Sequence, residues 1–106
     1  MLFLAHATMA QPADMSNKEF YGLWLEEAEA ALGAQKAGVI KELYKVAGKA
    51  EVYAVLDVES HDALDQAIQG LPFWKRGYSH VVTSLECTPL RPYANWYEHL
   101  KELASG

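Results

Sequence analysis

The feature that most constrains this chain is the order in which strand-like and helix-like patterns follow one another. Periods of two and of about 3.6 residues predict strand, helix, strand, strand, helix and strand, and residues 93–103 add a helical pattern at the end. The chain has 106 residues, which is enough for one hydrophobic core and not for two ordinary ones. We therefore expect one folded domain over residues 1–89 and a helical tail over residues 90–106.

The first two elements have clear local signals. Residues 1–10 alternate between a uniformly apolar set and a mixed set, as in a sheet that helices cover on one side. Ser16 precedes Glu19 by three residues, which is the spacing of a capping box, so a helix is expected over residues 17–35, ending near Gly38. The apolar stripe predicted for this helix consists of Phe20, Tyr21, Trp24, Leu25, Ala28, Ala31 and Leu32.

The middle of the chain predicts a hairpin followed by a short helix. Residues 39–46 and 51–58 predict two strands joined by a tight turn, which makes them antiparallel neighbours. Ser60 is a suitable N-cap for the short helix. An aromatic and basic loop over residues 73–78 then leads to a fourth strand over residues 79–87.

This order of elements is that of the ferredoxin-like α+β fold, in which an antiparallel sheet carries both main helices on one face. The uncovered face is expected to hold Leu2 and Leu4 beside His6, Lys41 and Lys45. An apolar sheet face without a cover favours face-to-face pairing with a second copy. We therefore expect a dimeric α+β barrel, or a larger homo-oligomer built from it.

Charge and cysteine content exclude several kinds of partner. Nine Lys and Arg against 14 Asp and Glu give a net charge of −5, which argues against nucleic acid and anionic membranes. Cys87 is the only cysteine, and the four histidines show no ligand spacing, so no metal site is expected, and the sequence offers no site for an organic cofactor. Residues 1–10 lack the basic start of a signal peptide, and no apolar run could span a membrane. We expect a soluble, cytoplasmic protein.

Short sequence elements spread over residues 1–89 carry a family resemblance. They are Met1-Leu2-Phe3, Pro12-Ala13-Asp14-Met15, Leu23, Glu27, Gly38, Ala47-Gly48, Tyr53-Ala54-Val55-Leu56-Asp57-Val58, Ser60, Ala63-Leu64 and Leu71-Pro72. Together they resemble the muconolactone Δ-isomerase family, small ferredoxin-like enzymes of aromatic-compound breakdown that form high-order oligomers. The resemblance implies a cofactor-free isomerase that shifts a double bond in a small unsaturated lactone. The chain departs from the family at Glu42, at Tyr44 and over residues 74–80.

The double-bond shift implied by the resemblance proceeds by proton transfer between two carbons. It needs a base within reach of both carbons, and a cation or hydrogen-bond donor for the developing oxyanion. Glu27 is the candidate base, because it borders the apolar stripe, where burial raises a carboxyl pKa. The alternative is an ordinary surface glutamate, as we expect for Glu26 on the far side of the helix. His6 is the second catalytic candidate, as a proton shuttle or oxyanion donor. The alternative is a hydrogen-bonded histidine inside the dimer barrel.

Five further residues are candidates for binding the substrate. Lys41 and Lys45 alternate on one strand and are suited to a substrate carboxylate, unless they form salt bridges between subunits. Trp24, Tyr53 and Trp74 are suited to line an aromatic pocket, although core packing is the usual role of such residues. Trp74 belongs to the aromatic and basic loop, which is either a lid over an anionic ligand or a solvated segment.

Two other functions remain open at this point. The aromatic loop and the added tail are also consistent with a cyclase, or with another proton-transfer enzyme that acts on a larger aromatic or polyketide ring. A non-catalytic oligomeric binding module is the third possibility, in which the carboxylate and the histidine serve structure alone.

Overall fold

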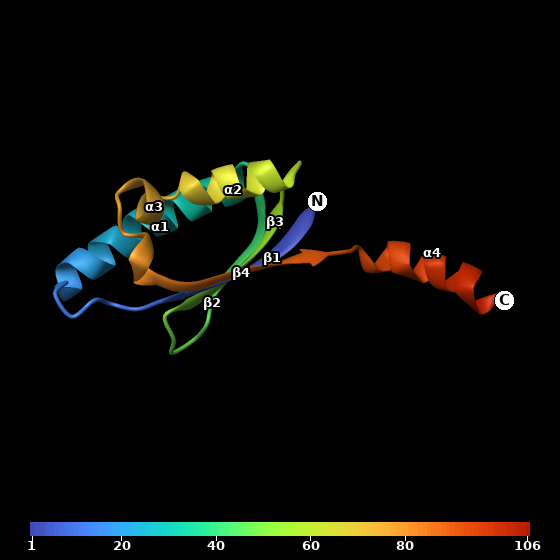
Figure 1. The fold of residues 1–106 in the computed structure, drawn as a ribbon, viewed down its shortest axis with the longest axis horizontal. Helices are drawn as coiled ribbons and strands as arrows, with labels where there is room; N and C mark the ends of the chain where they lie inside the picture. The colour runs from blue at the N-terminus through green and yellow to red at the C-terminus, as the bar shows by residue number, and fades with distance from the viewer.

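The computed structural model describes residues 1–106 and contains the predicted elements in the predicted order (Figure 1). The elements are β1 (Leu2–Met9), α1 (Asn17–Lys36), β2 (Ile40–Lys45), β3 (Glu51–Asp57), α2 (His61–Gln69), α3 (Pro72–Lys75), a 3₁₀ turn (Ser79–Val81), β4 (Val82–Leu90) and α4 (Tyr93–Ala104). The strands form one sheet in the order β2-β3-β1-β4, with every neighbouring pair antiparallel. Both α1 and α2 lie on the same face of this sheet (Figure 1). The ferredoxin-like α+β prediction is therefore confirmed.

Local signals place the ends of α1 as expected. The backbone N–H of Glu19 donates to the Ser16 hydroxyl at 3.1 Å, and that hydroxyl donates to the Glu19 carboxylate at 3.1 Å, which completes the capping box. The chain leaves the helix through Gly38, whose φ of 87° lies in the left-handed region that glycine adopts without strain. The helix ends at Lys36, one residue later than predicted.

The predicted apolar stripe of α1 is wrong in its rotation about the helix axis. Tyr21, Leu25 and Leu32 are 59%, 60% and 57% exposed, whereas Phe20 and Leu23 are buried. Leu23 was outside the predicted stripe, yet it joins the core cluster that also contains Met9, Phe20, Phe73 and Val81. Contacts with α3 therefore turn the buried face of α1 toward Leu23 and, one turn further, toward Glu27.

Two strand predictions also need correction. The strand predicted from residue 79 begins at Val82, because residues 79–81 form the 3₁₀ turn. A β-bulge in β2 shifts its register with β3 between Ile40 and Glu42. Beyond the bulge, Leu43 and Lys45 share the face that the helices cover, so the expectation that Lys45 lies on the open face is wrong.

Little of the chain is fully buried within a single protomer. Only eight of 106 residues are buried, and α4 contributes none of them. The uncovered sheet face exposes Tyr53 and Leu90 by 37% and 39%. The tail helix extends away from the body, and the protomer measures 61 Å along its longest axis (Figure 1). None of the helices has the length and apolar character needed to cross a lipid bilayer.

Candidate active site

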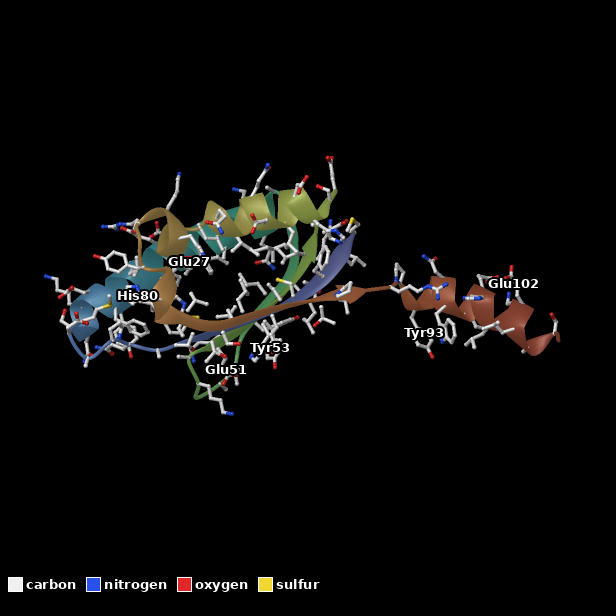
Figure 2. All side chains as sticks on the ribbon, viewed as in Figure 1. Glu27, Glu51, Tyr53, His80, Tyr93 and Glu102 are labelled. Carbon is white, nitrogen blue, oxygen red and sulfur yellow. The ribbon has the colours of Figure 1, made fainter.

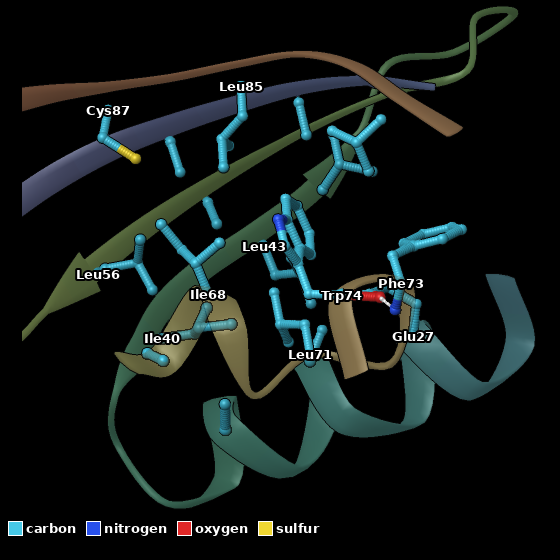
Figure 3. A pocket seen from close by; sticks show the side chains of 18 of the residues that line it. Glu27, Ile40, Leu43, Leu56, Ile68, Leu71, Phe73, Trp74, Leu85 and Cys87 are labelled. Carbon is cyan, nitrogen blue, oxygen red and sulfur yellow. Dashed lines mark hydrogen bonds between the residues drawn. The ribbon is translucent and has the colours of Figure 1, made fainter. Parts of the chain in front are cut away.

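An apolar cavity of about 160 Å³ lies between the sheet and the helices (Figure 3). Of the 22 residues that line it, 21 are hydrophobic, and Glu27 is the one charged member. The sheet side of the cavity includes Ala5, Ala7 and Ala54, whose side chains end at Cβ and leave the space between the layers unfilled. Trp74 contributes to the helical side. The cavity therefore isolates one carboxylate among apolar groups.

The Glu27 carboxylate is held by a backbone group of α3. The N–H of Phe73 donates to Glu27 Oε2 at 2.9 Å (Figure 3). Phe73 is the second residue of α3, where a helix leaves N–H groups without partners, and the N-cap residue Leu71 supplies no side-chain acceptor. The other carboxylate oxygen, Oε1, makes no hydrogen bond within the chain. One oxygen is thus fixed while the other is free to take a proton.

The surroundings of Glu27 favour its protonated form. Burial raises the pKa of Glu27 above its ordinary value of 4.5, and the hydrogen bond from Phe73 opposes this rise with a smaller effect. The physical cause is that the apolar lining cannot solvate a negative charge. A carboxyl group with a raised pKa is well suited to accept and return a proton near neutral pH.

Glu27 also borders a second, more open space. A groove of about 430 Å³ between α1 and β2 shares Trp24, Glu27 and Leu43 with the cavity. Lys45 is the other charged residue of this groove. Its Nζ donates to the carbonyl oxygen of Val46 at 3.1 Å and retains further donors for a ligand. The bulge in β2 therefore places a cation on the same side of the sheet as the isolated carboxylate.

A surface ion pair joins α1 to the end of α3, the two helices that also meet through Glu27 and Phe73. Nη1 of Arg76 donates to both carboxylate oxygens of Glu26, at 2.6 and 2.5 Å. Glu26 is exposed, as expected, but its ion pair was not predicted, because its partner lies 50 residues along the chain. A chain-local pattern contains no signal for such a pair.

His6 does not reach Glu27. Its Nε2 lies 2.8 Å from Glu51 Oε1, and its ring stacks on Tyr53 with centroids 4.3 Å apart and planes at 8°. Figure 2 shows Glu51 and Tyr53 on the face of the sheet opposite to Glu27. A single protomer therefore forms two separate polar centres, and His6 and Tyr53 belong to the uncovered face.

Of the other expected site residues, Trp24 and Trp74 line the cavity, and Lys41 does not. Lys41 lies at the bulge and is exposed outside both spaces. The role of Phe73 as a hydrogen-bond donor was not predicted, although Pro72 at the first helical position is a recognised signal of a helix start. No group of three or more His, Cys, Asp or Glu side chains is gathered as a metal would require.

The fold and the site together define a ferredoxin-like α+β enzyme with one carboxylate in an apolar cavity. The sequence model of the family described as muconolactone delta-isomerase matches residues 1–95. The chain belongs to the muconolactone Δ-isomerase family and is an isomerase. The resemblance seen in its sequence elements is confirmed.

Individual relatives agree with this assignment. The chain is 32% identical over 81 residues to a muconolactone Δ-isomerase of Cupriavidus pinatubonensis, which covers 76% of this chain and 88% of that one. It is 32% identical over 74 residues to a muconolactone Δ-isomerase of Pseudomonas putida, with 70% and 77% covered. A crystal structure of muconolactone isomerase matches with a TM-score of 0.72 at 29% identity, covering 87% of this chain and 90% of that one.

Proposed function

We propose that this isomerase shifts a carbon–carbon double bond in a small, carboxylated, unsaturated lactone such as muconolactone, with Glu27 as the base and without a cofactor. The observation that carries the proposal is the single carboxylate among the 22 residues of the cavity. Apolar walls suit a hydrocarbon ring and keep water from the reacting carbons.

The chemistry follows from the two oxygens of Glu27. The free Oε1 takes a proton from one ring carbon, and the electron pair of the broken C–H bond delocalises toward the lactone carbonyl as a dienolate. The same O–H then returns its proton to a second carbon, which completes the shift of the double bond. Because Oε2 accepts the Phe73 N–H at 2.9 Å, the carboxyl group stays in place between the two steps.

Lys45 has the charge needed for the substrate's negative groups. It borders the groove that also contains Glu27, and it is exposed. We propose that Lys45 binds the substrate carboxylate or stabilises the developing oxyanion. Trp24 and Trp74 line the cavity and are assigned the apolar part of the lactone. The cavity of about 160 Å³ is smaller than the roughly 300–1,000 Å³ of pockets that hold drug-sized ligands, which favours a small lactone over a polyketide ring.

The uncovered sheet face is assigned to assembly with a second copy. Eight buried residues are few for a chain of 106, and Tyr53 and Leu90 remain exposed on this face. His6, paired with Glu51, would then be a hydrogen-bonded histidine within the interface. We propose a homodimer or a larger homo-oligomer.

Incubation with muconolactone in heavy water tests the reaction. NMR should show the double bond moving within the lactone, with deuterium at the second carbon wherever the Glu27 proton exchanges with solvent before its return, and Glu27→Gln should abolish the shift. Thermal stabilisation by a polycyclic ligand without conversion of muconolactone would favour the larger-substrate enzyme. The absence of both effects would favour the binding module.

A further inference from the structure

We propose that Arg76 is a positioning residue, which holds α3 through its ion pair with Glu26 so that the Phe73 N–H stays on the Glu27 carboxylate. The catalytic meaning of this role rests on the proposed function, whereas the geometric role can be tested without it. Arg76 touches neither the cavity nor the groove beside Glu27.

Two contacts join α1 to α3. Glu26 and Glu27 are neighbours on α1, and their partners, Arg76 and Phe73, are three residues apart at the two ends of α3. One contact fixes the first turn of α3 and the other fixes its C-cap. Nη1 of Arg76 reaches both Glu26 oxygens, so the ion pair fixes the distance between the end of α3 and α1, and together with the Phe73 contact it limits rotation of α3.

The short helix needs such external support. It has four residues and no side-chain cap, and a helix of this length is not stable on its own. The Phe73 ring, which is 1% exposed, anchors α3 in the core. Leu71 and Trp74 line the cavity as well, so the inner side of α3 is held by apolar packing, which has no directional preference. A hydrogen bond weakens steeply once its angle falls. The ion pair adds a polar contact at the exposed end of α3 that keeps the Phe73 N–H aimed at Glu27.

A rival account is that the charges near Glu27 act only through their electric field. The titratable or charged groups on the elements around it include Tyr44 and Lys45 on β2 and Cys87 on β4, which line the cavity or the groove, and Glu26 on α1 with Lys75 and Arg76 at the end of α3, which do not. If only the electric field matters, the direction in which the pKa of Glu27 shifts depends on the sign of the charge removed. Loss of the Arg76 cation would raise the pKa of Glu27, and loss of the Glu26 anion would lower it.

Positioning predicts a different pattern. Arg76→Gln and Glu26→Gln break the same ion pair, so both should loosen α3, weaken the Phe73 hydrogen bond and raise the pKa of Glu27. Exposed Lys75 makes no ion pair, so Lys75→Gln removes a neighbouring cation without releasing α3 and is the matched control. The double variant that exchanges the two residues, Glu26→Arg with Arg76→Glu, should restore the parental pKa of Glu27.

The primary readout is the titration of the Glu27 carboxyl carbon by NMR in protein labelled at the glutamate δ-carbon, assigned through its absence in Glu27→Gln. The second readout is the acid limb of kcat/KM for muconolactone. It should move to higher pH in both single variants, with about two- to fivefold lower kcat/KM on that limb, the scale of an exposed ion pair. The alkaline plateau should be unchanged, which a merely destabilised protein would not explain.

Opposite shifts in Arg76→Gln and Glu26→Gln would overturn the proposal in favour of the field alone, and unchanged titrations would overturn it outright. Failure of the parent protein to isomerise muconolactone would refute the proposed function instead. The NMR titrations would still decide the role of Arg76.

Discussion

Replacing Glu27 with Gln separates the basicity of this side chain from its structural contact. The amide is nearly the same size, and its oxygen can still accept the 2.9 Å hydrogen bond from the Phe73 N–H. What disappears is the ability to take a proton. Turnover should fall by about 10²-fold or more, the scale of losing a positioned general base. At 1.36 kcal/mol for each factor of ten, this raises the barrier by at least about 2.7 kcal/mol.

The same change should make the protein more stable at neutral pH. Burial raises the pKa of Glu27 above its ordinary 4.5, so the folded protein holds this proton more firmly than the unfolded chain does. As pH rises from below 4.5 through the raised pKa, ionisation therefore costs the parent stability that Glu27→Gln retains. The difference in melting temperature should be absent in acid and should grow to a plateau above the folded pKa.

Steady-state kinetics and thermal melts from acid to neutral pH provide the measurements. Glu29→Gln is the matched control, because Glu29 is exposed on the same helix and the substitution removes the same charge. Glu26→Gln is unsuitable here, since Glu26 pairs with Arg76. The control should keep its rate, and its stability should stay within about 0.5 kcal/mol of the parent. Equal turnover by parent and Glu27→Gln, or a lower melting temperature of Glu27→Gln at pH 7, would refute the reasoning.

Three further outcomes are expected. Phe73→Ala should cost about 3–5 kcal/mol in urea unfolding, because the ring is 1% exposed and anchors α3; a cost below about 1 kcal/mol would contradict this role. Light scattering at micromolar concentration should give at least twice the 11.8 kDa protomer mass, and a stable monomer would exclude pairing of the sheet faces. Burial raises the pKa of Cys87, so iodoacetamide should alkylate it more slowly in the folded than in the unfolded protein at pH 8.

The parts of the fold that depend on neighbours in sequence were predictable. The capping box at Ser16 and the exit through Gly38 are decided within a few residues, and the structure contains both. The rotation of α1 was not predictable in the same way. Its apolar residues outnumber those that the core can bury, and the choice of Leu23 over Leu25 depends on contacts with distant residues such as Phe73 and Val81.

In the candidate site, too, the features decided by nearby residues were predictable and those that depend on distant residues were not. Glu27 could be proposed because its helical position borders the apolar side, and its presence in the cavity agrees with that expectation. Its hydrogen-bond donor, Phe73, lies 46 residues away and acts through its backbone, which carries no residue-type signal. Lys45 was assigned to the wrong face because a bulge of one residue changes the alternation of β2, and nothing in that segment marks the bulge.

The three alanines of the cavity have a consequence for how readily its size can change. Ala5 and Ala54 lie directly opposite each other on β1 and β3, and Ala7 is the next residue along the same face. Their backbone positions are set by a continuous antiparallel ladder, so exchange for a larger residue adds methyl groups to the cavity without altering the strands. Each such exchange changes the space beside Glu27 while leaving the carboxylate and its Phe73 donor in place. Substitution at these three positions can in this way reshape the cavity one methyl group at a time.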